Sequence, residues 1–170
     1  MSHVQKLTTA GVLAAAGVAL SPFSIPVGVA RCFPVQHMIN VIAGVLLGPA
    51  YAVAMAFATS LFRNLIGTGT LLAFPGSMLG ALLAGLAAKY MRGRLVPACA
   101  GEMLGTGVLG ALAAYPVAAF LMGREVALFA FVIPFSVSSV GGAVIAFVLL
   151  TVLMRAGIFK TRMPNRQNGL

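Results

Sequence analysis

The sequence predicts an all-α integral membrane protein built as a compact bundle of six transmembrane helices. Hydrophobic residues make up 61% of the chain and charged residues only 8%, whereas soluble domains carry about 25% charged residues. The mean hydropathy of +1.06 agrees and excludes a disordered chain. Six spans of about 20 residues take most of the 170 residues. We therefore expect one transmembrane domain over 1–155 and a basic cytoplasmic tail over 156–170.

Six apolar segments define the expected helices. The first follows Lys6, and the second is short because Gly48 and Pro49 form a break that helices rarely cross. We expect only a few residues in the connections after the second, fourth and fifth segments. The predicted segments are residues 7–22, 35–47, 50–66, 71–90, 95–122 and 126–155.

The basic residues orient the bundle. If the N-terminus is cytoplasmic, eight Lys and Arg residues lie inside and only Arg31, Arg63 and Arg124 lie outside, so the positive-inside rule places both termini in the cytoplasm. The net charge of +9 comes from residues at the edges of apolar runs and therefore does not indicate nucleic-acid binding. Cys32 and Cys99 fit no metal or redox spacing. No removable signal peptide is predicted, because the chain stays apolar beyond its first segment.

The first outer connection, residues 21–34, contains three prolines and is too apolar for an ordinary solvated loop. Non-helical backbone near membrane depth is tolerated where it packs on protein or lines a cavity. We expect a lid over an outward-facing cavity, with Phe33 and Pro34 as lid residues. The alternative is a loop lying among the lipid headgroups.

Polar side chains near the outer side predict a small-molecule pocket. Gln36, His37 and Asn40 share one face of the second segment, and Arg63 and Asn64 lie at the outer end of the third. An apolar lining with a few placed polar groups is typical of ligand pockets. The aromatic walls would come from Phe33, Phe74 and Tyr115. For Arg63 the alternative is snorkelling to the headgroups.

Glu102 is the only acid within a predicted span, and Thr106 follows it by one turn. An ionised acid at a helix centre costs about 2.5–3.5 kcal/mol, so Glu102 needs partners or is neutral. Counting from Leu95 places it only about 10 Å above the inner boundary. We include Glu102 and Thr106 among the candidate substrate-binding residues, with a role in fixing the fifth helix as the alternative. Arg124 and Glu125 are expected to be solvated.

Small residues four apart, such as Gly44 with Gly48, predict close internal helix packing. The alanines of the first segment occupy more than one face, so part of that surface is available to another protein. No metalloprotease, serine-hydrolase or Walker A motif is present, and no acids are paired. We therefore predict neither an enzyme nor a cofactor or metal site, and any uphill transport would draw on a gradient or a partner.

Several runs resemble the ThiW family. They are residues 21–28 (SPFSIPVG), 32–40 (CFPVQHMIN), 44–49 (GVLLGP), 63–76 (RNLIGTGTLLAFPG), 101–107 (GEMLGTG) and 114–116 (AYP). ThiW proteins are assigned as substrate-binding S components of energy-coupling factor (ECF) transporters for hydroxyethylthiazole, a thiamine precursor.

The resemblance implies an S-component-like six-helix bundle that binds its ligand near the outer face, under the first loop. It implies association with a membrane coupling subunit and two ATPase subunits, and toppling in the membrane to release the ligand inward. It also implies that an Ala-x-x-x-Ala pattern on the first helix contacts the coupling subunit. Ala10 and Ala14 match that spacing, and so do Ala15 and Ala19.

These observations predict a thiazole-binding component of an ATP-driven importer in the cell membrane of a prokaryote. His37, Asn40 and Gln36 would hydrogen-bond the ligand, and Arg63 and Asn64 would shape the outer rim. The alternatives are an S component for the pyrimidine half of thiamine, a solitary gradient-driven carrier, and a membrane enzyme or assembly factor.

Overall fold

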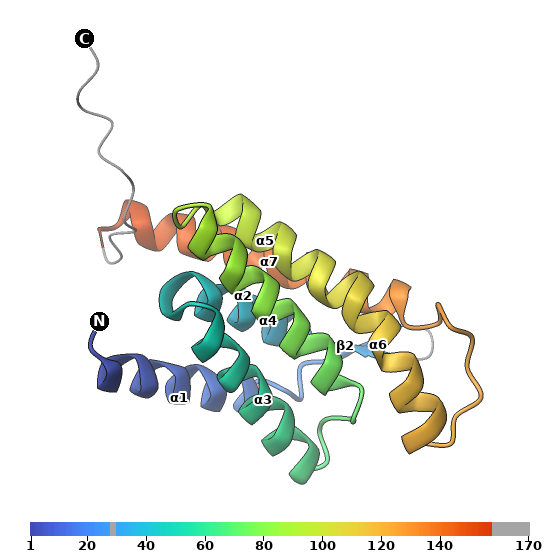
Figure 1. Ribbon diagram of the computed structural model, residues 1–170. Coiled ribbons are helices and arrows are strands. Elements are labelled where there is room, and N and C mark those ends of the chain that lie inside the picture. Colours follow the sequence, from blue (N-terminus) through green and yellow to red (C-terminus); the bar gives the residue numbers. More distant parts are fainter. Residues whose placement is uncertain (28–29, 158–170) are drawn as a thin grey trace.

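The structure, a computed structural model, describes residues 1–27 and 30–157 and consists of helices with one short hairpin (Figure 1). The tail residues 158–170 lie outside the described part, and with them three of the basic residues that predict a cytoplasmic tail. In chain order the elements are α1 (His3–Ala19), β1 (Ile25–Val27), β2 (Ala30–Cys32), α2 (Pro34–Leu47), α3 (Pro49–Leu65), α4 (Ala73–Tyr90), α5 (Leu95–Leu104), η1 (Gly105–Gly110), α6 (Ala111–Pro116), η2 (Val117–Leu121) and α7 (Val132–Arg155).

The elements α5, η1, α6 and η2 follow one another without a break and form one helical rod, Leu95–Leu121. Six helical segments therefore cross the described part of the chain, and the prediction of a helical protein is confirmed. The segments η1 and η2 are π-helical. This geometry is rare in proteins, and where it occurs it is often at a functional site.

Local signals in the sequence start and stop these helices. Ser2 caps α1 through a reciprocal capping box with Gln5. Pro34 and Pro49 are the first residues of α2 and α3, where a missing N–H costs no helical hydrogen bond. Between them, Gly48 turns the chain with a φ of +85°, a conformation that residues with a Cβ rarely adopt.

Helix α2 is the centre of the bundle. Nine of its 14 residues are buried, and it packs against α1, α3, α4, α5 and α7. A helix of 14 residues is only about 21 Å long. Since the longer helices around it extend further, α2 leaves space at one end of the bundle.

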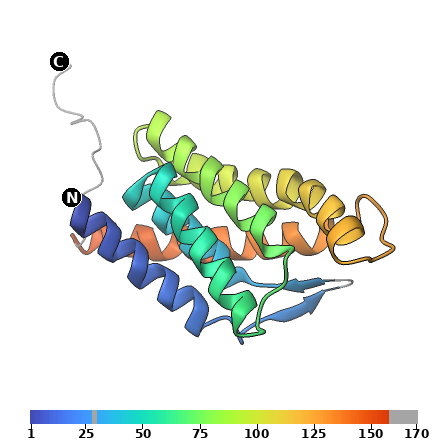
Figure 2. The ribbon, with the colours of Figure 1, turned by 60° about the horizontal axis from the view of Figure 1, so that its bottom comes forward.

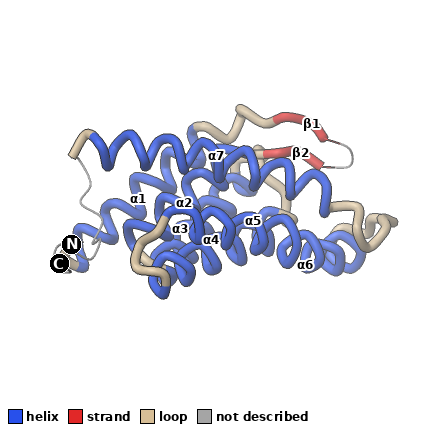
Figure 3. The backbone as a smooth tube through the Cα atoms, turned by 90° about the horizontal axis from the view of Figure 1, so that it is seen from above, coloured by secondary structure: helices blue, strands red, loops and turns tan. Residues whose placement is uncertain are grey.

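That end, the loop end, gathers the hairpin and the connections α3–α4 and α6–α7, while α1 starts and α7 finishes at the opposite end (Figure 2). The strands pair antiparallel, with Ile25 opposite Cys32 and Pro26 opposite Arg31. The hairpin lies beside α7 (Figure 3). The segment predicted as a non-helical lid is thus a β-hairpin in its described residues.

Within residues 1–27 and 30–157, two helices are long and apolar enough to cross a membrane by length and composition: Leu95–Leu121 with 27 residues and Val132–Arg155 with 24. Helix α2 is apolar but shorter. The six-span topology, the cytoplasmic termini and the domain division stay predictions.

One connection differs clearly from the sequence prediction. The last helix begins at Val132 rather than at residue 126, so the connection after η2 is longer than the few residues expected. Gly123 turns the chain with a φ of +60°, and Phe131 is fully buried as an anchor. Since residues 126–131 are apolar, hydropathy alone does not distinguish this connection from a helix.

Small residues bring helices into contact, as predicted. A Cβ on Gly44 would lie 2.8 Å from the backbone nitrogen of Gly85 in α4. Gly48 is different, because nothing lies within 4 Å of its Cβ position and its role is the turn.

The partner contact expected at Ala10 and Ala14 stays a prediction, and the structure covers both residues with the chain itself. Both residues are buried in the chain's own core, in the cluster that α1 forms with α2, α3 and α4. Ala15 and Ala19, the second matching pair, are exposed. The helix turns one small-residue face inward, and this leaves the other face open.

Candidate functional site

A cavity of about 510 Å³ opens at the loop end, above the N-terminal end of α2. This volume lies within the range of small-molecule pockets. The hairpin, α2, the α3–α4 connection, α4, the α6–α7 connection and α7 all contribute to its lining. Among the lining side chains, Gln36, His37, Ser77 and Ser138 are polar and Phe33 and Phe135 are aromatic.

Beneath the cavity, three polar side-chain atoms converge on one carboxylate oxygen. His37 Nδ1 lies 2.7 Å, Thr106 Oγ1 2.9 Å and Asn40 Nδ2 3.2 Å from Glu102 Oε1. The His37–Glu102 distance is in the range of charge-assisted hydrogen bonds. We call His37, Asn40, Ser77, Glu102 and Thr106 the carboxylate cluster.

Helix periodicity positions these side chains. His37 and Asn40 are three apart on α2, and Glu102 and Thr106 are four apart at the junction of α5 and η1, so each pair shares a face. Gly80 of α4 makes room for them, because a Cβ there would lie 2.5 Å from Glu102 Oε2. The position of Glu102 along its helix agrees with its contact to His37, because the short helix α2 places His37 well inside the bundle.

Ser77 fixes the orientation of the Asn40 amide. Asn40 Nδ2 lies 3.2 Å from the carbonyl oxygen of Ser77, which can only accept a hydrogen bond. The nitrogen of the amide must therefore face this carbonyl and Glu102 Oε1. Asn40 itself is fully buried and does not line the cavity.

Arg63 is fully buried and lies behind Phe33. Its guanidinium carbon is 3.8 Å from the centre of the Phe33 ring, and its Nη2 donates to the carbonyl oxygen of Thr68. Neither the snorkelling alternative nor a place on the cavity wall matches this position. Asn64 donates to the carbonyl oxygens of Ser60 and Thr70, so both residues support the α3–α4 connection.

The aromatic walls differ from the prediction. Phe74 pairs with Phe57, with ring centres 5.6 Å apart, and neither Phe74 nor Tyr115 lines the cavity. Phe33 lines it as predicted, and Phe135 of α7 is the second aromatic side chain. A shared face of α7, with Phe135 and Ser138 three apart, was the signal available in the sequence.

The base of the hairpin is fastened to α7. Cys32 is 1% exposed, and its Sγ lies 3.0 Å from the carbonyl oxygen of Pro134. Phe33 N donates to Ser138 Oγ over 2.7 Å. Burial raises the pKa of the Cys32 thiol, against a smaller lowering by a backbone hydrogen bond at Ser138, so the thiol stays a neutral donor. Pro34 packs on α7 beside Gly142 rather than on the cavity.

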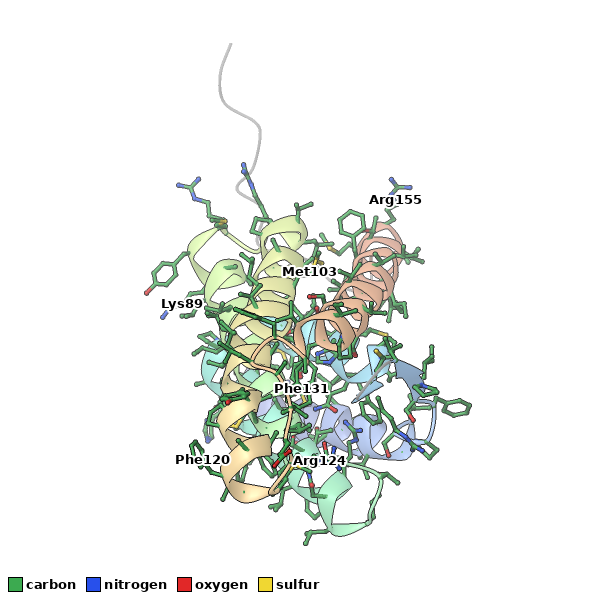
Figure 4. All side chains as sticks on the ribbon, turned by 90° about the vertical axis from the view of Figure 1, so that its right-hand side faces the viewer. Lys89, Met103, Phe120, Arg124, Phe131 and Arg155 are labelled. Carbon is green, nitrogen blue, oxygen red and sulfur yellow. The ribbon has the colours of Figure 1, made fainter. Side chains whose placement is uncertain are left out.

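Two exposed arginines, Arg31 of β2 and Arg124 of the α6–α7 connection, flank the cavity mouth. Figure 4, which views the loop end, shows Arg124 near the middle and Phe120 at the edge. The sequence predicted Arg124 only as a solvated residue. Within residues 1–27 and 30–157, no group of three or more His, Cys, Asp or Glu side chains is placed to hold a metal ion.

Comparison with known proteins identifies one family. Residues 7–156 match the family model described as thiamine-precursor transporter protein (ThiW). No curated protein and no solved structure shows significant similarity to the chain.

Proposed function

The chain belongs to the ThiW family of thiamine-precursor transporters, and we propose that it is the substrate-capturing S component of an ECF-type importer with hydroxyethylthiazole as its ligand. The observation that carries the proposal is the cavity at the loop end, whose polar floor is held by the carboxylate cluster. The protein would lie in a prokaryotic cell membrane as a six-span domain with cytoplasmic termini and a basic tail.

The chemistry of the cavity supports this ligand. Hydroxyethylthiazole is neutral, with a ring nitrogen that accepts a hydrogen bond and one hydroxyl group. His37 and Gln36 supply polar groups, and Phe33 and Phe135 supply aromatic surface. Ser138 Oγ already accepts from Phe33 N, which leaves its own O–H for the ligand.

Tight binding of so small a ligand requires nearly complete enclosure. The ligand has about nine non-hydrogen atoms, and the best small ligands gain about 1.5 kcal/mol per atom. A hairpin fastened to α7 through Cys32 and lying over the cavity supports such enclosure.

The exposed face of α1 supports docking to a coupling subunit. Gly11, Ala15 and Ala19 are spaced four apart and exposed, and small residues let two helices approach closely in lipid. We place the contact at Ala15 and Ala19, because Ala10 and Ala14 are covered by the chain itself. The ATPase subunits would supply the energy.

Two measurements test the proposal. Titration calorimetry in detergent compares hydroxyethylthiazole with the pyrimidine half of thiamine, and we expect micromolar or tighter binding of the thiazole alone. Binding of the pyrimidine alone would reassign the ligand. Uptake into vesicles should need the coupling subunit, both ATPases and ATP, whereas uptake by the chain alone would indicate a solitary carrier.

A substitution tests the docking face. Ala15→Trp places a large side chain on the exposed stripe and should abolish co-purification with the coupling subunit while ligand binding is kept. The matched control is Val144→Trp, which changes an exposed residue of α7 and should leave assembly intact. Equal assembly of both variants would remove the α1 contact from the proposal.

A further inference from the structure

The two ring nitrogens of His37 have different surroundings. Nδ1 lies 2.7 Å from Glu102 Oε1, while Nε2 makes no hydrogen bond within the described residues. The buried side-chain atoms without a partner in this part of the chain are two nitrogens of Arg63 and Glu102 Oε2. Since Nε2 is not among them and His37 lines the cavity, Nε2 faces the cavity.

The charge of the His37–Glu102 pair determines whether Nε2 carries a proton. The pair is neutral overall in two forms: an imidazolium with a carboxylate, or an imidazole that accepts at Nδ1 from a carboxylic acid. Nε2 carries a hydrogen in both forms. Only the third form, an imidazole that donates from Nδ1 to a carboxylate, leaves a lone pair on Nε2.

Burial disfavours that third form, because it leaves one uncompensated negative charge on a fully buried side chain. No other cation compensates it, since the only salt bridge in residues 1–27 and 30–157 is the one between His37 and Glu102. Arg63 is held instead by the Phe33 ring and the Thr68 carbonyl oxygen. The geometry therefore favours an N–H at Nε2, wherever the shared proton lies.

We propose that Glu102 is a specificity-determining positioning residue that makes His37 Nε2 an obligatory hydrogen-bond donor to the ligand. The cavity then selects neutral heterocycles whose ring nitrogen has a free lone pair. It rejects rings without that nitrogen, and it rejects N-alkylated rings such as the thiazolium of intact thiamine. The inference rests on the proposed function and deepens it.

The first test uses the unaltered protein and three ligands. These are hydroxyethylthiazole, its thiophene isostere with CH in place of the ring nitrogen, and its N-methylthiazolium derivative. Calorimetry should show the thiazole binding at least about tenfold more tightly than either analogue, because each analogue covers the Nε2 donor without accepting its hydrogen bond. Equal binding of thiazole and thiophene overturns the inference alone. If none of the three ligands binds, the proposed function is overturned and the inference with it.

The second test changes the pair without changing its shape. In Glu102→Gln, the oriented Asn40 nitrogen keeps an oxygen at the Oε1 position. That amide oxygen can only accept from His37 Nδ1, so neutral His37 presents a lone pair at Nε2. The thiazole-to-thiophene affinity ratio should fall from about ten or more towards one.

Both ligands are measured on the same variant, so a general loss of stability does not by itself change the ratio. The matched control is Cys99→Ala, three residues earlier on α5 and outside the cavity lining and the cluster. It should keep the ratio of the unaltered protein. An unchanged ratio in folded Glu102→Gln overturns the inference, and if that variant does not fold, the ligand series on the unaltered protein decides.

Discussion

The two halves of α2 are held in the bundle by different means. The outer half presents Gln36, His37 and Asn40, which are buried and hydrogen-bonded to groups on α3, α4 and α5. The inner half presents Ala43, Gly44 and Leu47, which pack against small residues of α1, α3 and α4.

The comparison assigns contact with the ligand to one half of α2 and close helix packing to the other half. In lipid no hydrophobic force drives helices together, so they associate through close packing and interhelical hydrogen bonds. The inner half of α2 relies on close packing, and the outer half relies on interhelical hydrogen bonds. Substitutions in the inner half should therefore change stability alone, whereas those in the outer half should also change ligand binding.

The largest expected effect comes from breaking the buried pair. His37→Leu leaves Glu102 without its nearest partner and should lower the free energy of unfolding by about 3–5 kcal/mol. The double variant His37→Leu/Glu102→Leu should recover most of this loss, because two apolar side chains often replace a buried pair at little cost. Unfolding by SDS in mixed micelles measures both. A double variant no more stable than the single one would contradict the pairing of His37 with Glu102.

A smaller effect, about 1–3 kcal/mol, is expected from the same substitution at two glycines. Gly44→Ala places a Cβ 2.8 Å from the Gly85 nitrogen, and Gly80→Ala places one 2.5 Å from Glu102 Oε2. Both should lower the melting temperature, but only Gly80→Ala should also weaken ligand binding, because it displaces the carboxylate that holds His37.

The matched control for both is Gly11→Ala on exposed α1, where nothing lies within 4 Å. It should be neutral or slightly stabilising, since alanine favours helix by up to about 1 kcal/mol. Weakened ligand binding in Gly44→Ala would show that the two halves of α2 are not separable.

The smallest effect concerns the hairpin anchor. Burial raises the pKa of the Cys32 thiol, so its contribution to stability is complete below the ordinary thiol pKa of about 8.5 and is lost as pH rises through the raised value. Cys32→Ser keeps a hydroxyl donor for Pro134 but does not titrate in this range. Melting curves from pH 7 to 10 should fall more steeply for the unaltered protein, and parallel curves would show that Cys32 stays out of reach of base.

Periodicity and hydropathy predicted much of the bundle. The break at Gly48 and Pro49, the shared face of His37 and Asn40, and the non-helical segment before α2 all follow from local residue types. The connection before α7 did not, because residues 126–131 are as apolar as a helix and only the burial of Phe131 reveals their place.

The site residues that share one face of a single helix were predictable from the sequence. Those that come together from segments far apart in the chain were not. Counting the rise per residue from Leu95 placed Glu102 too far from the outer side to reach the pocket. The count did not include the position of His37, which the short helix α2 places close to Glu102. Phe135, Ser138 and Arg124 come from two other segments, and their meeting at the cavity depends on the bend after η2 and the hairpin contact with α7.

The shortness of α2 has a consequence for the path of the ligand. Ten residues of α2 follow His37, which places the imidazole about 15 Å from the inner end of the helix, against a hydrocarbon core of about 30 Å. In a six-span membrane topology, a molecule resting on His37 has travelled about half of the bilayer before any subunit moves. In that topology one closely packed seam of alanine, glycine and leucine would separate the molecule from the cytoplasm, and release by toppling would leave this seam closed.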